Sequence, residues 1–564
     1  MTAFNLADLF EIVADACPDR IALVTDAPPG GTAGRPAGTT LRLTYAELDA
    51  RANRVAHHLS AAGVRAGDHV GILSYNRAEW LESMIGCFKL RAAPVNVNYR
   101  YVADELSHLL GDSACVALIA ERSLLARVDR AALPRLRHVL VIEDSPDGDV
   151  SGTPGAAPTG HATARMYEEA LAQAPDVRDF GPRSGDDPYL LYTGGTTGLP
   201  KGVLWRSEDI FFAAMGGGNF GGPPIERPEL LAAAAGREPL RAQVHAPLMH
   251  GGGQWISWIT LTTGGTIILW SERSFDARRS LRLAVRERSQ ILMLVGNGMA
   301  QPIADELATG SHPDLAVFAF GSGGAPLSPD VRQRLLAAVP GAYVSDNLGG
   351  SETGAMGASD GSGRFRLGPE FAVLGPDLVP VGARPGAVGI VARTGHIPLG
   401  YWADEKKTAE TFVRSPDGRR WVLQGDYARV EEDGAVTLLG RGSLVINTGG
   451  EKVYAEEVET VLRAHPAVAE AMVIGVADPR LGQRVTAVVA AAPAAVPGAE
   501  PAAAPAGSFV LDQEALAREL MAHCRSSLAG YKVPREFRFT EGVRHTPVGK
   551  PDYAWARSLF AAPG

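Results

Sequence analysis

This sequence has few cysteines, no long apolar run and no excess of basic residues. Only four of its 564 residues are cysteines, and no two form a Cys-x-x-Cys pair. That pattern excludes a disulfide framework and a cysteine metal site, and it predicts reduced, mostly buried thiols in a cytoplasmic protein. No segment approaches the run of about 18 apolar residues that a transmembrane helix needs, so no membrane-spanning segment is expected.

Basic residues are also in the minority. The chain has 54 Lys and Arg against 63 Asp and Glu, which gives a formal net charge of -9. A nucleic-acid-binding protein would carry a basic patch or domain, so no nucleic-acid partner is expected. The segment Met1–Glu11 carries acidic residues and no basic stretch, which argues against a signal peptide.

The length of the chain is too great for one compact core, so two or more domains are expected. Near the start, apolar strands alternate with helical patterns, which predicts an α/β fold with a largely parallel sheet. Thr44–Glu47 is a capping box that opens a helix. The predicted elements that follow are a helix with its apolar face at Leu48–Leu59, a strand at Val70–Leu73, a helix at Trp80–Leu90 and an extended segment at Ala93–Asn98.

Glycine and proline mark the breaks between these elements. Ala27–Thr40, Asp144–Ala164 and Ala492–Gly507 are poor in core residues and are predicted to be exposed loops. Ala316–Pro326 is typical of a strand that runs into a glycine turn. Ser328 should then cap a helix that begins at Pro329.

The character of the chain changes near residue 440, where Gly440–Ser443 is small and polar enough to be a hinge. Beyond it the sequence predicts a small α+β unit. Its predicted elements are a helix at Ala455–His465, strands at Val468–Val476 and Val485–Ala491, and a last helix with its buried face at Leu516–Cys524. We therefore expect a large N-terminal domain at 1–440 and a smaller C-terminal domain at 441–564.

The most informative stretch is Tyr192–Val203, which is rich in glycine and threonine. Glycine backbone can curl around an anion with its N–H groups pointing inward, while hydroxyls and Lys201 add donors and positive charge. The pattern predicts a polyphosphate cradle; the alternative is a Gly/Thr-rich surface hairpin. It is not a Walker A loop, because Pro200 and Gly202 flank the lysine. The predicted phosphate-binding residues are Thr193, Gly194, Gly195, Thr196, Thr197, Gly198 and Lys201.

This stretch resembles the signature loop of the adenylate-forming superfamily, which includes acyl-CoA synthetases, peptide-synthetase adenylation domains and luciferases. Gly194 stands where most members have serine. The resemblance extends over nearly the whole chain. It implies a large N-terminal domain of layered sheets and helices, a mobile C-terminal lid, and the use of ATP, Mg²⁺ and coenzyme A.

Two further motifs resemble nucleotide-binding parts of that superfamily. Asn347–Thr353 resembles the motif whose glutamate, here Glu352, ligates Mg²⁺, a cation that prefers oxygen ligands. Two residues depart from it: Leu348 replaces an aromatic that lies against adenine, and Ser351 replaces threonine. The resemblance places adenosine against the segment Gly323–Pro326, which includes Gly324, Ala325 and Pro326. Asn347, Leu348 and Ser351 are also predicted to contact the nucleotide.

The ribose and the transferred group would meet residues further along. Asp426 matches the aspartate that binds both ribose hydroxyls, and Arg441 matches an arginine that reaches the ribose or the phosphate. Leu444 stands where that arginine's motif has an aspartate. Lys550 matches the lysine that the lid carries to the carboxylate and the α-phosphate. Without the resemblance, Glu352, Asp426, Arg441 and Lys550 would be interpreted as exposed loop or turn residues.

The remaining site residues concern coenzyme A and the acid. Asn447–Lys452 resembles the loop that faces the site during thioester formation, which assigns Gly449, Gly450 and Lys452 to coenzyme A. His250 stands where peptide-synthetase domains have an aspartate for an amino group, which favours an acid without one. Trp255, Trp258 and Ile291–Val295 are candidates for an apolar acyl pocket, with core packing as the alternative for His250 and for each of these.

Together these motifs predict an ATP-dependent acyl-CoA synthetase. Val203–Arg206 and Ile446–Lys452 look most like the branch that acts on medium- or long-chain fatty acids and sterol side-chain acids. The partners would be a small carboxylic acid, ATP and coenzyme A, and a homodimer is compatible with the sequence. The alternatives are an aryl-acid CoA ligase, an acyl-AMP ligase that loads a carrier protein, and a non-catalytic acyl- or nucleotide-binding protein.

Overall fold

The structure is a computed structural model. It describes residues 3–26, 38–129, 132–144, 163–193, 200–325, 327–359, 364–441, 445–448, 451–478, 482–492, 513–528, 530–545 and 551–560. The chain forms two compact units: residues 1–362 with 393–422 make the larger one, and residues 363–392 with 423–564 the smaller one. The predicted α/β class is confirmed. The smaller unit takes in residues before 441, and the domain boundary after residue 440 stays a prediction.

The first sheet of the larger unit is parallel except for β9, which runs antiparallel to both of its neighbours, β19 and β8. In spatial order, its described strands are β19 (Gly400–Tyr401), β9 (Lys201–Arg206), β8 (Pro188–Thr193), β4 (Ala93–Asn96), β3 (His69–Leu73), β5 (Ala117–Glu121), β6 (His138–Ile142) and β7 (Thr163–Met166). Such parallel strands are buried on both faces.

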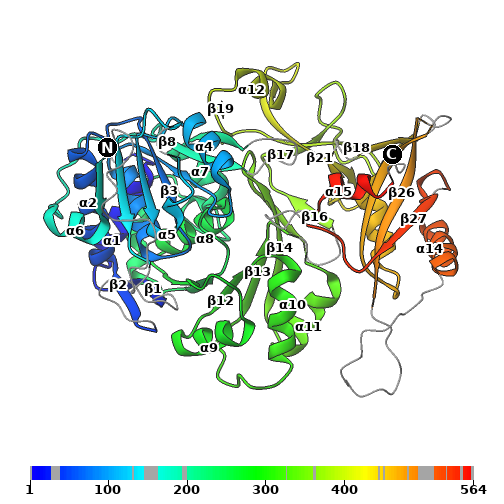
Figure 1. Cartoon of the computed structure of the whole chain (residues 1–564), viewed down its shortest axis with the longest axis horizontal. Helices are drawn as coiled ribbons and strands as arrows, with labels where there is room; N and C mark the ends of the chain where they lie inside the picture. The colour runs from blue at the N-terminus through cyan, green and yellow to red at the C-terminus, as the bar shows by residue number, and fades with distance from the viewer. Residues whose placement is uncertain are drawn as a thin grey trace. The chain divides into compact units, whose positions relative to one another are not determined.

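Helices cover both faces of this sheet (Figure 1). Ile119 of β5 packs in a cluster with α2 (Tyr45–Ala61), α3 (Ala78–Lys89) and α6 (Tyr167–Gln173). Its neighbour Leu118 packs on the opposite face, because successive side chains of a strand alternate. On that face lie α4 (Ala103–Asp112) and α5 (Arg122–Leu125).

The predicted start of α2 is confirmed. The Thr44 hydroxyl accepts from the Glu47 backbone N–H at 3.1 Å, and the Glu47 carboxylate accepts from the Thr44 N–H at 2.8 Å. These reciprocal bonds satisfy two helix-end donors that would otherwise lack partners.

The second sheet of the larger unit is parallel except for antiparallel β15 and β2 at its ends. Its strands are β15 (Gly354–Ser359), β14 (Tyr343–Gly350), β13 (Ala319–Gly323), β12 (Ile291–Leu294), β10 (Arg241–Val244), β11 (Thr266–Leu269), β1 (Ile21–Asp26) and β2 (Thr40–Thr44). One face packs on α9 (Ala277–Glu287), α10 (Gly296–Leu307) and α11 (Pro329–Ala338). Ser328 caps α11 as predicted, because its hydroxyl accepts from the Val331 N–H.

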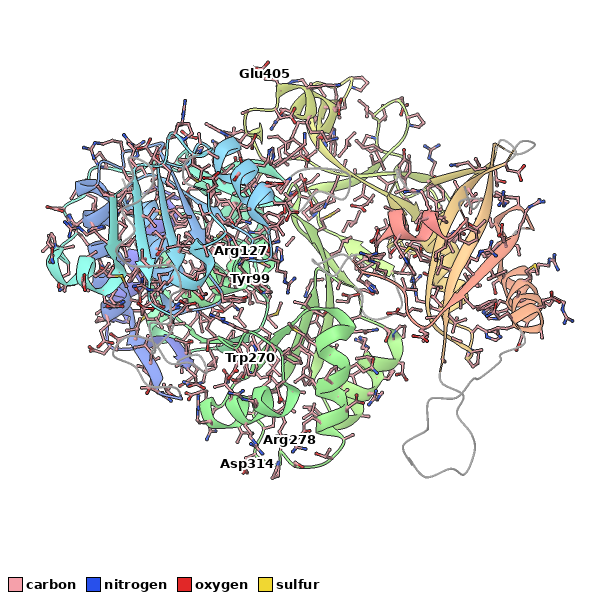
Figure 2. All side chains as sticks on the ribbon, viewed as in Figure 1. Tyr99, Arg127, Trp270, Arg278, Asp314 and Glu405 are labelled. Atoms are coloured by element: carbon pink, nitrogen blue, oxygen red, sulfur yellow. The ribbon has the colours of Figure 1, made fainter. Side chains whose placement is uncertain are left out.

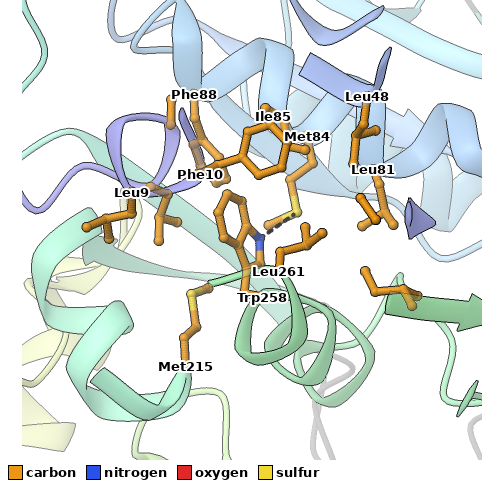
Figure 3. Close-up of a cluster of buried hydrophobic side chains, with 14 of the residues drawn as sticks. Leu9, Phe10, Leu48, Leu81, Met84, Ile85, Phe88, Met215, Trp258 and Leu261 are labelled. Carbon is orange, nitrogen blue, oxygen red and sulfur yellow. Dashed lines mark hydrogen bonds between the residues drawn. The ribbon is translucent and has the colours of Figure 1, made fainter. Parts of the chain in front are cut away.

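A helical layer lies between the two sheets, since one apolar cluster joins Trp205 of β9 to Ile267 of β11. Its helices are α1 (Leu6–Ala16), α2, α3, α7 (Ser207–Ala214) and α8 (Gly251–Thr262). Trp258 of α8 is central to this layer and is only 1% exposed. Figure 3 shows its indole N–H aimed at the Met84 sulfur, 3.5 Å away. Trp258 is therefore a core residue.

The larger unit also holds four short segments. These are η2 (Gly216–Gly218), η3 (Pro228–Gly236), α12 (Glu405–Thr411) and β20 (Phe412–Arg414). Of these, α12 begins directly after Asp404. None of the helices in the described ranges has the length and apolar character that a membrane crossing requires. The four cysteines are free and buried, as predicted.

The smaller unit contains two groups of paired strands. The first runs in the order β17 (Phe371–Leu374), β18 (Val388–Arg393), β21 (Arg420–Val430), β22 (Val436–Arg441) and β16 (Arg364–Leu367). The second comprises β24 (Glu451–Tyr454), β23 (Val445–Thr448), β26 (Gly482–Ala491), β25 (Val468–Asp478) and β27 (Glu536–Thr540). The other elements are α13 (Ala455–Arg463), α14 (Gln513–Ser527), η5 (Gly530–Lys532) and α15 (Tyr553–Ser558).

The predicted elements of the C-terminal part are confirmed, and Leu516, Leu520 and Cys524 form the buried face of α14. The predicted loops are only partly within the described residues. Residues 27–37, 145–162, 442–444 and 493–512 lie outside them. Two loop edges were wrong: Thr40 begins β2 and Ala164 belongs to β7, because backbone pairing with β1 and β6 extends into both segments.

Candidate active site

The predicted phosphate loop connects two paired strands. β8 and β9 are antiparallel, and their register sets Thr193 opposite Lys201. Asn96 holds the end of β8: its amide oxygen accepts from the Tyr192 N–H at 2.7 Å and its amide nitrogen donates to the Tyr192 carbonyl at 2.9 Å. The loop is thus carried by a hairpin with a rigid base.

The loop itself contains most of the residues predicted for phosphate. Gly194, Gly195, Thr196, Thr197 and Gly198 lie outside the described residues. β8 and β9 form a hairpin in either interpretation of the stretch, so the flanking strands leave both the phosphate cradle and the surface hairpin open. The two interpretations differ only in whether the loop residues bind phosphate, and that role stays a prediction.

Lys201, the first residue of β9, has a specific partner. Its ammonium donates to the Oδ2 atom of Asp404. The other carboxylate oxygen of Asp404 accepts from the Lys407 backbone N–H at 2.9 Å and so caps α12. The hydrogen bonds from Lys201 and from the Lys407 backbone hold the pKa of Asp404 below its usual value, so the carboxylate is charged at neutral pH.

Glu352 lies on the turn between β14 and β15, and three donors hold this turn. The Trp205 indole N–H donates to the Ser351 carbonyl at 2.9 Å. The buried Arg393 guanidinium donates to the Thr353 carbonyl. The Tyr401 hydroxyl donates to the Glu352 Oε1 atom at 2.8 Å. The carboxylate is half-buried and oriented, unlike that of a freely solvated loop acid.

A glycine lets this turn pack closely on α7. Gly354 has a φ of +66°, and a Cβ atom there would lie 2.6 Å from the Ala213 carbonyl oxygen. Arg393 also donates to that carbonyl, at 3.0 Å. Any larger residue at 354 would have to push the turn away from α7, so Gly354 indirectly sets the place of Glu352.

Sequence reasoning missed the segment that joins these two side chains. Tyr401 and Asp404 lie three residues apart, and β19 pairs with β9, the strand that begins at Lys201. The only available signal was an aspartate before a short helical pattern, which is typical of an N-cap. Nothing in the linear sequence connects it with Lys201 or Glu352, because the contacts span 203 and 49 residues.

The residues predicted for adenosine lie at the carboxyl ends of adjacent parallel strands. β13 and β14 pair with Gly323 opposite Asn347. The Asn347 amide donates to the Ser322 carbonyl at 2.8 Å, and Gly324 is exposed with a φ of +78°. Ligands of open α/β sheets bind at such strand ends. Ala325 and Leu348 are half-buried beside these positions, and Pro326 lies outside the described residues.

Asp346 on β14 was not predicted. Burial raises the pKa of this carboxyl to about 6, although a backbone hydrogen bond from Leu327 opposes the shift. Its neighbours on β13 are small, with Ser322 directly opposite. An ionisable group near neutrality therefore lies one residue from Asn347.

The two residues predicted for the acid lie at the start of α8. His250 is the half-buried residue before the helix. The Trp255 indole N–H donates to the Tyr189 hydroxyl at 3.2 Å, which in turn donates to Gln254 at 2.6 Å. A Cβ at Gly251 would lie 2.7 Å from the Trp255 ring, so the glycine makes room for the indole. Trp255 packs at the edge of the core, and its contact with an acid stays a prediction.

The smaller unit carries the other predicted residues. Asp426 and Arg441 are directly opposite in the antiparallel pair of β21 and β22. The side chain of Arg441 is outside the described atoms, as are the side chain of Lys452 and the whole of Gly449, Gly450 and Lys550. The backbone of Lys452 pairs with Asn447 across β23 and β24. The ribose, coenzyme A and lysine roles stay predictions.

Comparison with known proteins agrees with this arrangement. The AMP-binding enzyme family matches residues 10–402, and the AMP-binding enzyme C-terminal domain matches residues 457–550. The 3-oxocholest-4-en-26-oate–CoA ligase of Rhodococcus rhodochrous is 42% identical over 98% of this chain and 96% of its own length.

Two further relatives are similar along almost the whole chain. The medium/long-chain-fatty-acid–CoA/3-oxocholest-4-en-26-oate–CoA ligase of Mycobacterium tuberculosis (strain CDC 1551 / Oshkosh) is 42% identical over 99% of this chain and 97% of its own length. The crystal structure of the anthranilate CoA ligase AuaEII in complex with anthranoyl-AMP has a TM-score of 0.75 at 23% identity, and covers 99% of this chain and 98% of that one. That last likeness concerns the fold alone.

Proposed function

The chain belongs to the AMP-binding enzyme family, and we propose that it is an ATP-dependent acyl-CoA synthetase for medium- or long-chain fatty acids or sterol side-chain acids. In the first step a carboxylate oxygen attacks the α-phosphorus of ATP, and pyrophosphate leaves. In the second step the thiol sulfur of coenzyme A attacks the acyl carbonyl carbon, loses its proton, and displaces AMP.

One observation carries the proposal most directly. Trp205 lies on β9, the strand that begins at Lys201. Its indole N–H donates to the Ser351 carbonyl at 2.9 Å, in the turn that holds Glu352. A nucleotide triphosphate with its cation needs an ammonium and a carboxylate held on one scaffold. Lys201 would neutralise the β- and γ-phosphates, and Thr193 and the loop residues would donate hydrogen bonds to them.

Glu352 is suited to hold Mg²⁺ with the nucleotide. Mg²⁺ is typically bound through one or two carboxylates together with substrate phosphates. The Tyr401 hydroxyl donates one hydrogen bond to the Oε1 atom of Glu352. The carboxylate has further lone pairs, which can bind a cation. Bound there, the cation would neutralise charge on the phosphates. Glu352 and its donors thus fit the cation.

The smaller unit would supply the remaining groups. Asp426 would accept from the ribose hydroxyls, with Arg441 beside it on the paired strand. Lys550 would bring a compact positive charge to the carboxylate and the α-phosphate during adenylation. Gly449, Gly450 and Lys452 would face coenzyme A during thioester formation. Leu348 replaces an aromatic residue, so adenine would pack on an aliphatic side chain.

The choice of acid rests on the named relatives and on His250. Relatives at 42% identity are named for fatty acids and for 3-oxocholest-4-en-26-oate. His250 offers no carboxylate for an amino group, which favours an acid without one. Free, buried cysteines are compatible with a reducing compartment such as the cytoplasm, and a homodimer is the oligomeric state to test by light scattering.

Pyrophosphate release with ATP and Mg²⁺ tests the proposal across a panel of short to long fatty acids, aryl acids and sterol side-chain acids, each with and without coenzyme A. Acyl-CoA and AMP should form from long-chain or sterol acids. Turnover on aryl acids alone would favour the aryl-acid ligase. Acyl-AMP formation without coenzyme A-dependent AMP release would favour carrier-protein loading. Release from no acid would contradict the proposal.

A further inference from the structure

The segment between β19 and α12 lies beside the loop lysine because of strand register. Tyr401 pairs with Val203 and Gly400 with Leu204 in an antiparallel ladder. The Trp402 N–H continues the ladder by donating to the Gly202 carbonyl at 2.8 Å. In this register Ala403 would lie opposite Lys201, but the chain turns at Ala403, which has a φ of +53°. Asp404, the next residue, then contacts Lys201.

Asp404 is also held in place from its own side. Its Oδ1 atom accepts from the Lys407 N–H, and its carbonyl accepts from the Thr408 hydroxyl at 2.8 Å. The Thr408 hydroxyl also accepts from the Tyr401 N–H at 2.9 Å, which closes the turn. One carboxylate oxygen is therefore anchored to α12, and the other is free to meet an ammonium.

The Oδ2 atom of Asp404 accepts from the Lys201 ammonium, and this ion pair is only partly shielded from water. The side chains of Lys201 and Asp404 are 44% and 30% exposed, respectively. A lysine ammonium has three protons on a flexible stem, so it can exchange one anionic partner for another. The neighbouring carboxylate of Glu405 differs, since it begins α12 and points outward (Figure 2).

From this geometry we infer that Asp404 is a positioning residue that occupies Lys201 in the nucleotide-free protein and is displaced by the phosphates of ATP. The inference rests on the proposed function, because Lys201 must be a phosphate ligand for the exchange to occur. Asp404 keeps the lysine aligned along β9 beside the loop. It also opposes nucleotide binding, because the ion pair has to break.

The size of the effect follows from the exposure of the pair. Ion pairs of this exposure contribute little to stability, so removing the competing carboxylate should tighten ATP binding only about two- to five-fold. Asp404→Asn is the appropriate change, because asparagine caps a helix about as well as aspartate and has nearly the same volume. Glu405→Gln removes the same charge from the next residue and serves as the matched control.

The experiment is a calorimetric titration of the full chain with ATP and Mg²⁺, without acid, for the wild type, K201A, D404N, E405Q and K201A/D404N. We expect K201A to weaken binding, D404N to tighten it about two- to five-fold, and E405Q to leave it nearly unchanged. In the K201A background, D404N should give no such tightening, because the partner is gone.

Two results would overturn the inference and are distinguishable from each other. If K201A weakens binding but D404N leaves it unchanged or weakens it, Asp404 is not a competitor and the phosphate role of Lys201 stands. If K201A leaves ATP affinity unchanged, Lys201 is not a phosphate ligand, and the proposed function loses its loop lysine together with this inference. Thermal unfolding of each variant checks that the fold is retained.

Discussion

Tyr401→Phe is the sharpest test of the arrangement around Glu352. The change removes one hydroxyl, which donates to the Glu352 carboxylate at 2.8 Å. It leaves the ring in place, where it packs edge-on against Phe412 at 5.9 Å between centroids. The variant therefore tests whether the orientation of one carboxylate matters, with little change to packing.

The expected loss can be estimated from the hydrogen bond. A hydrogen bond to a charged acceptor contributes about 1.5–3 kcal/mol when it is shielded from water. Because Glu352 is only half-buried, this bond should contribute about 1–2 kcal/mol. If the oriented carboxylate binds Mg²⁺ in the transition state, kcat/KM for acyl-AMP formation should fall about 5- to 30-fold. The Mg²⁺ concentration for half-maximal rate should rise as well.

The assay is pyrophosphate release at several Mg²⁺ concentrations, with thermal unfolding measured in parallel. Tyr343→Phe is the matched control, because Tyr343 is 63% exposed at the far end of β14 and the same hydroxyl is removed. Unchanged Mg²⁺ dependence and unchanged kcat/KM in Tyr401→Phe would refute the reasoning. So would a loss that Tyr343→Phe shares.

Three further outcomes are expected. Lys550→Ala should abolish acyl-AMP formation yet leave thiolysis of supplied acyl-AMP largely intact, and equal loss of both half-reactions would contradict a lid with two working states. Asp346→Asn should raise the melting temperature at pH 7.5, and the gain should shrink below about pH 5. Because the pKa of Asp346 is raised to about 6, the native state binds more protons than the unfolded state between the ordinary aspartate pKa and pH 6. The free energy of unfolding should therefore fall by about 1–2 kcal/mol, after screening, as the pH rises through that window. A variant that lacks this pH-dependent gain would contradict the raised pKa of Asp346. Trp258→Ala should destabilise the larger unit by about 3–5 kcal/mol through an unfilled cavity, and a melting temperature close to that of the wild type would show that the layer between the sheets can collapse around it.

Local patterns in the sequence predicted the elements well. The capping box at Thr44, the start of α11 at Ser328 and the buried face of α14 depend on residues within one or two turns of each other, so they can be read from spacing. The two wrong loop edges have the opposite cause. Thr40 and Ala164 are in strands because distant neighbours, β1 and β6, pair with them.

The candidate site also has a part that could be predicted from the sequence and a part that could not. Its residue types and motifs were readable, because a phosphate loop needs adjacent glycines, hydroxyls and a lysine within one short stretch. The hydrogen bonds that orient those residues were not readable. Arg393 and Tyr401 act on the turn of Glu352 from positions 40 and 49 residues away.

What the sequence by itself determined is therefore the family, the order of the motifs and the kind of chemistry, since these depend on residue identity along the chain. Tertiary structure alone decided which partners those residues have. Strand pairing of β19 with β9 brings Asp404 to Lys201, and the Trp205 indole reaches the turn of Glu352. Such contacts depend on register and on backbone direction in three dimensions. Residue spacing along the chain carries no record of either.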